Sequence, residues 1–411
     1  MDCLEALTRL SIADAHELLS PFWEASLACA PSHRPDLLNP VQITAERDFA
    51  GLPPSLDAAL HEVAARIAES PDLRLLICHC ERLAYEELDY EVATCCRDWP
   101  QYIAPLGDDT GLFYLLIALA AIPRMRAFHQ ARGIPDEVTR ATCSHFTASL
   151  ERFRLQHDNR DGFGTYALYW LRNHTTGSLY CLGRLEYMLK PFRGNLTAWR
   201  HRETGNVCAL AADGVHLDPE GLVADPEKAA TTTRFEETAD TITGHAIAPS
   251  GFIEPAPTAL PRQDWKRVLV AGDLIYEVHI PDGGGMTMAA CRDSMQQATK
   301  FFPRYFPEQT AVGFACSSWI LNPQLAQIYH PDSNMVRWQR ELYLYPVQSG
   351  DRSGLFFIFG TDDVDPATGP RDTSLRRAML DHMAAGGRLI GGGMFLMLED
   401  FERFGEQVYL A

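Results

Sequence analysis

LIYEVHI (residues 274–280) and PDGGG (residues 281–285) are the two adjoining segments that decide the fold of this chain. Apolar and polar residues alternate in LIYEVHI, as in a half-buried strand, which puts Glu277 and His279 on one face. The glycines predict a tight turn, and apolar residues at helical spacing predict a long helix that begins near Thr287. The stretch therefore predicts a strand, a glycine loop and a helix in direct succession.

This succession of elements is able to bind an anion. Glycines let the backbone approach a ligand closely, and the free amides at the start of a helix attract negative charge. Gly283, Gly284 and Gly285 would suit a pyrophosphate. Three glycines are also an ordinary way to turn from a strand into a helix, so the residues alone leave both interpretations open.

The sequence as a whole predicts two domains that differ in secondary structure. Residues 1–175 carry apolar positions at helical spacing and are expected to form a helical N-terminal domain. Residues 176–411 contain short β-prone runs, turn signals and further helices, and are expected to form a mixed-sheet C-terminal domain. Prolines between the β-prone runs and LIYEVHI predict a rigid connector at Pro255, Pro257 and Pro261. The predicted fold class is α+β.

Composition excludes several kinds of function. Lys and Arg number 36 against 54 Asp and Glu, which gives a net charge of −18. A surface this negative repels phosphate backbones and anionic membranes, so we expect no nucleic-acid partner and no membrane attachment. The most apolar run, residues 112–123, is shorter than the roughly 20 residues that span a bilayer.

The same totals predict a cytoplasmic protein. The first residues include Asp2 and Glu5 where a secretory signal would carry basic residues. The 11 cysteines form no disulfide framework and are expected to be reduced thiols. Cys78, His79 and Cys80 lack the spacing of paired Cys-x-x-Cys knuckles, so we expect buried thiols rather than a metal site.

The order of the C-terminal elements resembles the core of the GNAT-type acyltransferases, in which two parallel strands splay apart to admit the pantetheine arm of acyl-coenzyme A (acyl-CoA). Gly283 to Gly285 match the Gly-x-Gly part of that family's pyrophosphate loop, whereas Ile280 stands where the family usually has Gln or Arg. Asn322 and Tyr329 reproduce the spacing of a later family signature.

Several short sequence segments resemble those of a bacterial two-part acyltransferase-domain family. Its members join a helical N-terminal domain to a GNAT-like C-terminal domain. The segments are HIP (279–281), FFPRYF (301–306), SWIL (318–321) and SN (333–334), with LRN (171–173) and GRLE (183–186) fitting the junction. The resemblance covers most of the chain. It implies acyl-CoA as a co-substrate, no metal, and a donor site at Ile280, Gly283, Gly284, Gly285, Met286 and Asn322.

Acyl transfer from a thioester needs a base for the acceptor, a stabilised oxyanion and a proton for the departing thiolate. A neutral imidazole near pH 7 suits the base, which makes His279 a candidate, with Glu277 orienting it or acting through a water. The resemblance implies Tyr329 as the general acid. A strand-end histidine could instead satisfy a backbone group, and Tyr329 could simply pack the last turn of a short helix.

Three hypotheses follow from these residues. The first is an acyl-CoA-dependent acyltransferase that transfers directly to the amine or hydroxyl of a small molecule; the negative surface is consistent with a cationic acceptor. The second is a non-catalytic GNAT-like protein that binds a ligand or regulates, which the departure at Ile280 favours. The third and weakest is thioester hydrolysis. The oligomeric state is not indicated by the sequence.

Overall fold

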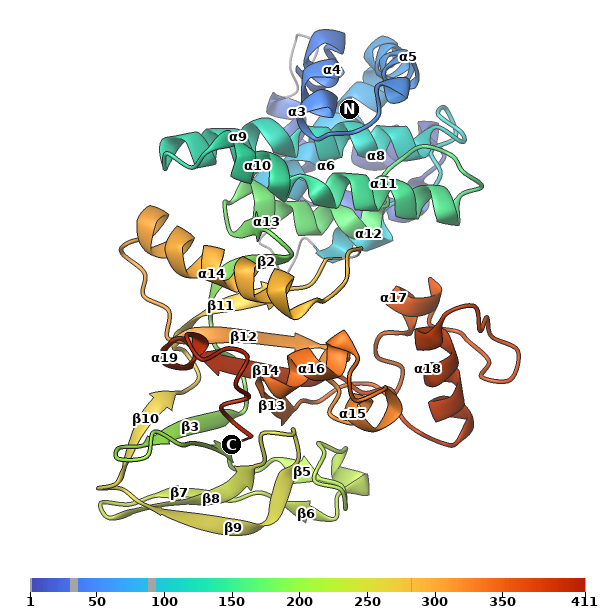
Figure 1. The fold of residues 1–411 in the computed structure, drawn as a ribbon. Coiled ribbons are helices and arrows are strands. Elements are labelled where there is room, and N and C mark those ends of the chain that lie inside the picture. Colours follow the sequence, from blue (N-terminus) through green and yellow to red (C-terminus); the bar gives the residue numbers. More distant parts are fainter. Residues whose placement is uncertain (1, 30–35, 88–93, 282, 411) are drawn as a thin grey trace. The chain divides into compact units, whose positions relative to one another are not determined.

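The structure is a computed structural model that describes residues 2–29, 36–87, 94–281 and 283–410. The chain divides into two compact units, residues 1–182 and 183–411 (Figure 1). Each unit has its own core and is described separately.

The first unit is built from helices and ends in the short strand β1 (Leu179–Leu182). Its first helices are α1 (Cys3–Arg9), α2 (His16–Leu19), α3 (Trp23–Cys29), α4 (Pro40–Phe49), α5 (Asp57–Glu69) and α6 (Pro71–Arg82). They are followed by α8 (Thr110–Leu119), α9 (Ala121–Ala131), α10 (Asp136–Thr142), α11 (Ser144–Gln156), α12 (Thr165–Leu168) and α13 (Arg172–Thr175).

Helix α8 is the centre of this unit. Its sequence TGLFYLLIAL has no polar face, all of its residues are buried, and α4, α5 and α6 pack against it. With α9 it forms a helical stretch, Thr110–Ala131, that is long and apolar enough to cross a membrane. However, 72% of its most apolar window is buried inside the unit, as in the core helix of a folded domain.

The second unit contains a mixed sheet with the strand order β2, β11, β12, β14, β13. These strands are β2 (Leu185–Pro191), β11 (Leu274–His279), β12 (Gly313–Ser318), β13 (Tyr343–Pro346) and β14 (Gly392–Met397). Strands β11 and β12 are parallel, and the other described pairs in this order are antiparallel. LIYEVHI thus forms a central strand, with a parallel neighbour on one side and an antiparallel neighbour on the other.

Helix α14 (Met288–Tyr305) packs on one face of this sheet. The ring of Tyr276 stacks on Phe302 at a centroid distance of 4.8 Å, and the hydroxyls of Tyr187 and Ser294 are hydrogen-bonded at 2.9 Å. Because side chains alternate along a strand, Glu277 lies on the opposite face from Tyr276. The predicted strand and helix are therefore both present, and His279 shares the face of Glu277.

The second unit also holds an antiparallel sheet with the order β10, β3, β4, β8, β7 and with β9 paired to β8. Its strands are β3 (Leu196–His201), β4 (Val207–Ala211), β7 (Phe235–Glu237), β8 (Thr241–Ile247), β9 (Ile253–Pro261) and β10 (Trp265–Leu269), beside the small pair β5 (His216–Leu217) and β6 (Thr231–Thr232). The Tyr343 hydroxyl joins the two sheets, since it donates to the Ile247 carbonyl at 2.5 Å and accepts from the Ala209 amide at 3.1 Å.

The expected proline connector is wrong, because Pro255, Pro257 and Pro261 all lie within strand β9. Strand β9 pairs with β8 and lies off the main path of the sheet, and an edge strand tolerates proline because one row of its amides needs no partner. Proline spacing alone does not separate an edge strand from a linker.

The remaining helices of the second unit are α15 (Leu325–Ile328), α16 (Asn334–Arg340), α17 (Leu355–Phe359), α18 (Ser374–Ala384) and α19 (Leu398–Phe401). Side chains of α15, α17 and α18 enclose a small apolar cluster that includes Leu325, Leu355, Ile358 and Met379.

Candidate functional site

The two parallel strands part at their carboxyl ends. Strand β11 pairs with β2 as far as His279, but its pairing with β12 stops at Glu277 opposite Ala315. Strand β12 continues beside β14 as far as Ser318. Ligands of sheets with parallel strands bind beyond the carboxyl ends of the strands, where the backbone diverges. The residues at this divergence therefore form the candidate site.

Glu277 and His279 are brought together there, on the face predicted from the sequence. Nε2 of His279 donates a hydrogen bond to Oε2 of Glu277 at 3.2 Å, and the two side chains are 27% and 40% exposed, respectively. Burial opposes ionisation of Glu277, but the hydrogen bond and the electrostatic influence of the nearby His279, Lys190 and Arg193 outweigh it and lower its pKa. Glu277 is thus the ionised partner that orients the imidazole.

A second carboxylate, which the sequence did not reveal, belongs to the residue opposite His279 on the neighbouring strand. Glu186 on β2 is directly opposite His279 in the antiparallel register and is only 4% exposed. Burial raises its pKa to about 7, although the charges of His279 and Arg184 act to lower it. Two carboxylates with opposite pKa shifts next to one imidazole are typical of sites that move protons.

Hydroxyl groups line the other side of the divergence. Ser317, which is exposed, hydrogen-bonds with the side chain of Tyr345, which is buried. A Cβ atom on Gly393 would lie 2.2 Å from the Tyr345 ring, so this glycine is required for the ring to lie against β14. Burial and the nearby Cys316 and Glu277 raise the pKa of Tyr345, which keeps the phenol protonated and able to donate.

The glycine loop follows β11 directly, with Asp282 lying outside the described residues. Gly283 and Gly284 have positive φ angles of 79° and 60°. The Arg184 guanidinium donates hydrogen bonds to the carbonyl oxygens of Pro281 (3.0 Å), Gly284 (3.3 Å) and Gly285 (3.4 Å). None of the described residues accepts a hydrogen bond from the amides of Gly283, Gly284 or Gly285. Arg184 therefore fixes the loop through its carbonyl groups.

The other predicted donor-site residues have mixed surroundings. Ile280 is partly exposed at the end of β11, and Met286 is buried, with its sulfur 4.0 Å from that of Cys291. Asn322 is 1% exposed, and its side-chain oxygen accepts a hydrogen bond from the Gln324 amide at 2.9 Å. That bond gives Asn322 a turn-forming role, and its contact with a ligand stays a prediction.

Tyr329 is not joined to His279 and Glu277 by any described hydrogen bond. It packs against the apolar cluster of α15, α17 and α18, and its hydroxyl is buried without a hydrogen-bond partner among the described residues. Burial raises the pKa of Tyr329. Its role as a general acid stays a prediction.

Metal ligands and nucleophilic thiols do not gather at this site. Within the described ranges, no group of three or more His, Cys, Asp or Glu residues could hold a metal ion. His79, between Cys78 and Cys80, is buried in the helical unit and is hydrogen-bonded to the Ser26 hydroxyl (2.8 Å) and the Leu19 carbonyl (2.7 Å). Burial raises the pKa of Cys291 to about 11, so its thiol is a poor nucleophile near neutral pH.

Comparisons with known proteins agree with this geometry. Residues 179–395 match the model of the GNAT-like C-terminal domain, and residues 43–177 match that of the N-acyltransferase N-terminal domain. No curated protein matches the chain. The two matched domains confirm the predicted two-part architecture and the α+β fold class.

Three solved structures share the fold. An acyltransferase mutant in complex with octanoyl-CoA is 21% identical with a TM-score of 0.54. An acyltransferase in complex with decanoyl-CoA is 20% identical with a TM-score of 0.51, and one in complex with decanoyl-CoA and teicoplanin is 21% identical with a TM-score of 0.50. Each comparison covers 86% of this chain and 98% of the other chain.

Proposed function

The chain belongs to the family that joins an N-acyltransferase N-terminal domain to a GNAT-like C-terminal domain, and we propose that it transfers an acyl group from acyl-CoA to an amine or hydroxyl of a small molecule. The observation that carries the proposal is the parting of β11 and β12 after Glu277 and Ala315, beside the imidazole of His279. A gap between two parallel strands would let the thioester of the donor reach the side chains that are proposed to transfer protons.

The glycine loop is the proposed site for the diphosphate of the donor. Its amides have no described acceptor, and they precede α14, whose N-terminal dipole favours negative charge. The three structures of similar fold were solved with octanoyl-CoA or decanoyl-CoA, so medium-chain donors are tested beside acetyl-CoA.

The proposed reaction is direct. The acceptor gives its proton to Glu186, through His279 or a water, while its nitrogen or oxygen bonds to the thioester carbon. The carbon–sulfur bond then breaks, and the thiolate takes a proton from a phenol, for which Tyr345 and Tyr329 are the candidates. Direct transfer is favoured over a covalent enzyme intermediate because Cys291 is fully buried and its pKa is raised.

The acceptor is proposed to be a small molecule, and a cationic one would be attracted by the net charge of −18. One neighbouring structure was solved with teicoplanin, a glycopeptide, so a glycopeptide amine is one acceptor to test. Release of free thiol in the presence of each acceptor identifies the class.

Calorimetric titration tests the donor site. We expect saturable binding of CoA and of at least one of acetyl-, octanoyl- and decanoyl-CoA. Gly284→Asp should weaken binding at least tenfold, because its carboxylate would meet the diphosphate. Asn also tolerates the positive φ of Gly284, so Gly284→Asn separates charge from strain.

Gly272→Asp is the matched control, since Gly272 also has a positive φ (97°) and open space around it, but precedes β11. It should bind the donor like the unchanged protein. If none of these CoA compounds binds, the proposal fails and the non-catalytic hypothesis replaces it.

A further inference from the structure

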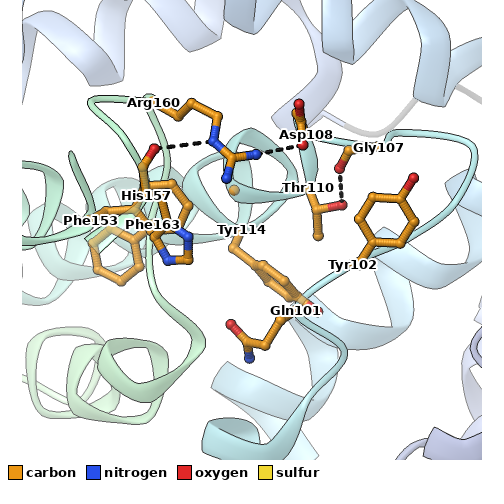
Figure 2. A pocket seen from close by; sticks show the side chains of 11 residues that line it. Gln101, Tyr102, Gly107, Asp108, Thr110, Tyr114, Phe153, His157, Arg160 and Phe163 are labelled. Atoms are coloured by element: carbon orange, nitrogen blue, oxygen red, sulfur yellow. Dashed lines mark hydrogen bonds and ion pairs between the residues drawn. The ribbon is translucent and has the colours of Figure 1, made fainter. Parts of the chain in front are cut away.

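The helical unit contains a hollow that the proposed acyl transfer does not use. It lies between the start of α8 with the loop before it and the end of α11 with the segment after it (Figure 2). Its volume is about 170 Å³. Cavities of about 150 Å³ hold a benzene ring, so the hollow has the size of one substituted six-membered ring.

The walls of this hollow are aromatic, and the ring of Phe153 is closely packed. Tyr102, Tyr114 and Phe153 line it. A Cβ atom would lie 2.4 Å from the Phe153 ring if added to Gly111, and 2.5 Å from it if added to Gly162. Because both residues are glycines, the ring packs directly against their backbone. Rings fixed in this way lose little freedom when a ligand ring packs against them.

The polar side of the hollow is set by the turn that ends α11. Asp158 and Asn159 both have positive φ angles, of 52° and 61°, and this pair reverses the chain after the helix. The Nε atom of Arg160 donates to the His157 carbonyl at 3.1 Å, and its NH1 group is paired with Asp108. Arg160 and Asp108 neutralise each other, so the hollow does not select for a charged ligand.

Two polar groups at the hollow are left for a ligand. The imidazole of His157 stacks on Phe153 at a centroid distance of 4.0 Å, and none of the described residues hydrogen-bonds its ring nitrogens. The Tyr102 side chain is 60% exposed, and its hydroxyl is likewise without a described partner. Both groups donate or accept, which suits a hydroxyl, because a hydroxyl also does both.

We propose that this hollow is a binding site for a small phenol, with the phenol ring packed among Tyr102, Tyr114 and Phe153 and its hydroxyl hydrogen-bonded to His157. The site lies wholly within residues 101–163, so the proposal stands apart from acyl transfer and from the donor site.

Saturation-transfer NMR on the full chain tests this proposal with three probes: p-cresol, toluene, which lacks the hydroxyl, and 4-methylcyclohexanol, which lacks the aromatic ring. We expect p-cresol to bind with a Kd on the order of 1 mM, as a ligand of this size allows. Toluene should bind about fivefold more weakly, which corresponds to the loss of one hydrogen bond. The cyclohexanol should bind more weakly still.

Two variants locate the binding. His157→Phe keeps a ring stacked on Phe153 and removes only the nitrogens, so it should bring p-cresol down to the affinity of toluene. Tyr102→Ala changes an exposed residue and should weaken both aromatic probes without affecting the fold. His16→Phe, at a partly exposed histidine outside the hollow, is the control and should change nothing. Equal binding of p-cresol and toluene, non-saturable signals, or an equal effect of His16→Phe would overturn the proposal.

Discussion

Histidines in the two units have opposite surroundings. In the helical unit, His79, His129 and His174 are at most 1% exposed, and desolvation lowers the pKa of each to about 4. In the second unit, His279 lies at a strand end beside the carboxylate of Glu277 and opposite that of Glu186. The same residue type is thus a neutral packing element in one unit and, in the proposed function, a proton carrier in the other.

The difference teaches that surroundings, and not residue type, identify a reactive histidine. A buried imidazole with its nitrogens bonded to a hydroxyl and a carbonyl, as in His79, has nothing to exchange protons with. His279 has two carboxylates of different pKa nearby, and we propose that it exchanges protons with them. The predictions below test this contrast from the largest expected effect to the smallest.

Acid should unfold the helical unit. A histidine with a pKa of about 4 in the folded state and 6.5 in the unfolded state binds its proton first in the unfolded chain, so stability is complete above 6.5 and falls as the pH drops towards 4. Protonation of each of the three should lower the free energy of unfolding by roughly 3 kcal/mol. The sum is comparable with the whole stability of a typical domain. Far-UV circular dichroism during urea unfolding, repeated between about pH 7 and pH 4, measures the fall.

His129→Gln should reduce by one the number of protons that the helical unit takes up on unfolding, because residue 129 then no longer titrates. The free energy of unfolding should therefore change less steeply with pH. His330→Gln is the control, since this side chain is 77% exposed in the second unit and should leave the slope unchanged. A helical unit equally stable at about pH 7 and pH 4 would contradict the contrast between the units.

Turnover should depend on the two residues that face each other across β2 and β11. We expect His279→Ala and Glu186→Gln each to lower kcat by about 100-fold or more, as loss of a general base does. Because burial raises the pKa of Glu186 to about 7, turnover should rise with pH through that value in the unchanged protein, and Glu186→Gln should abolish this rise. Thiol release from acyl-CoA, measured across pH, is the assay.

Folding and donor binding provide the controls for this pair. A buried carboxylate with a raised pKa costs stability once the pH exceeds its unfolded value, so Glu186→Gln should be at least as stable as the unchanged protein at about pH 8. Both variants should still bind CoA. Full turnover of His279→Ala would show that His279 is a packing residue like those of the helical unit.

Helix caps give the smallest effect and separate the two units. The Ser70 hydroxyl accepts from the Leu73 amide at the start of α6, and the Thr287 hydroxyl accepts from the Ala290 amide at the start of α14, each at 3.3 Å. Ser70→Ala and Thr287→Ala should each cost about 1 kcal/mol and lower Tm by roughly 2–4 °C. Hydrogen exchange followed by mass spectrometry should find each loss in the unit that carries the changed cap, and a loss spread over both units would contradict this.

Local patterns in the sequence predicted the centre of the second unit. Alternation in LIYEVHI predicted a strand with Glu277 and His279 on one face, and the structure has β11 there with those two side chains hydrogen-bonded. The apolar spacing after Thr287 predicted a helix, and α14 is present there with Cys291 and Met295 among its buried residues. These features depend on residues close together in the chain, so a period of two or of 3.6 residues suffices to find them.

Long-range register could not be predicted. Glu186 reaches His279 only through the pairing of β2 with β11, which lie about 90 residues apart, and no local pattern specifies that pairing. The hollow in the helical unit could not be predicted for the same reason, because Tyr102 and His157 come from separate segments of the chain. The prolines of β9 were wrongly predicted to form a connector for a related reason, since an edge strand is identified only by the order of strands in the sheet.

Arg184 lies two residues beyond Leu182, the last residue of the helical unit, and its guanidinium is hydrogen-bonded to the Pro281 carbonyl at the glycine loop. Glu186, which lies opposite His279, follows two residues later. Any exchange of helical units between relatives, in evolution or in the laboratory, therefore has a narrow crossover point. A joint before Gly183 keeps Arg184 and Glu186 with the strand β2 that positions them, whereas a joint after Glu186 would replace both. A recombinant that is to keep both side chains therefore has to be joined at or before Gly183.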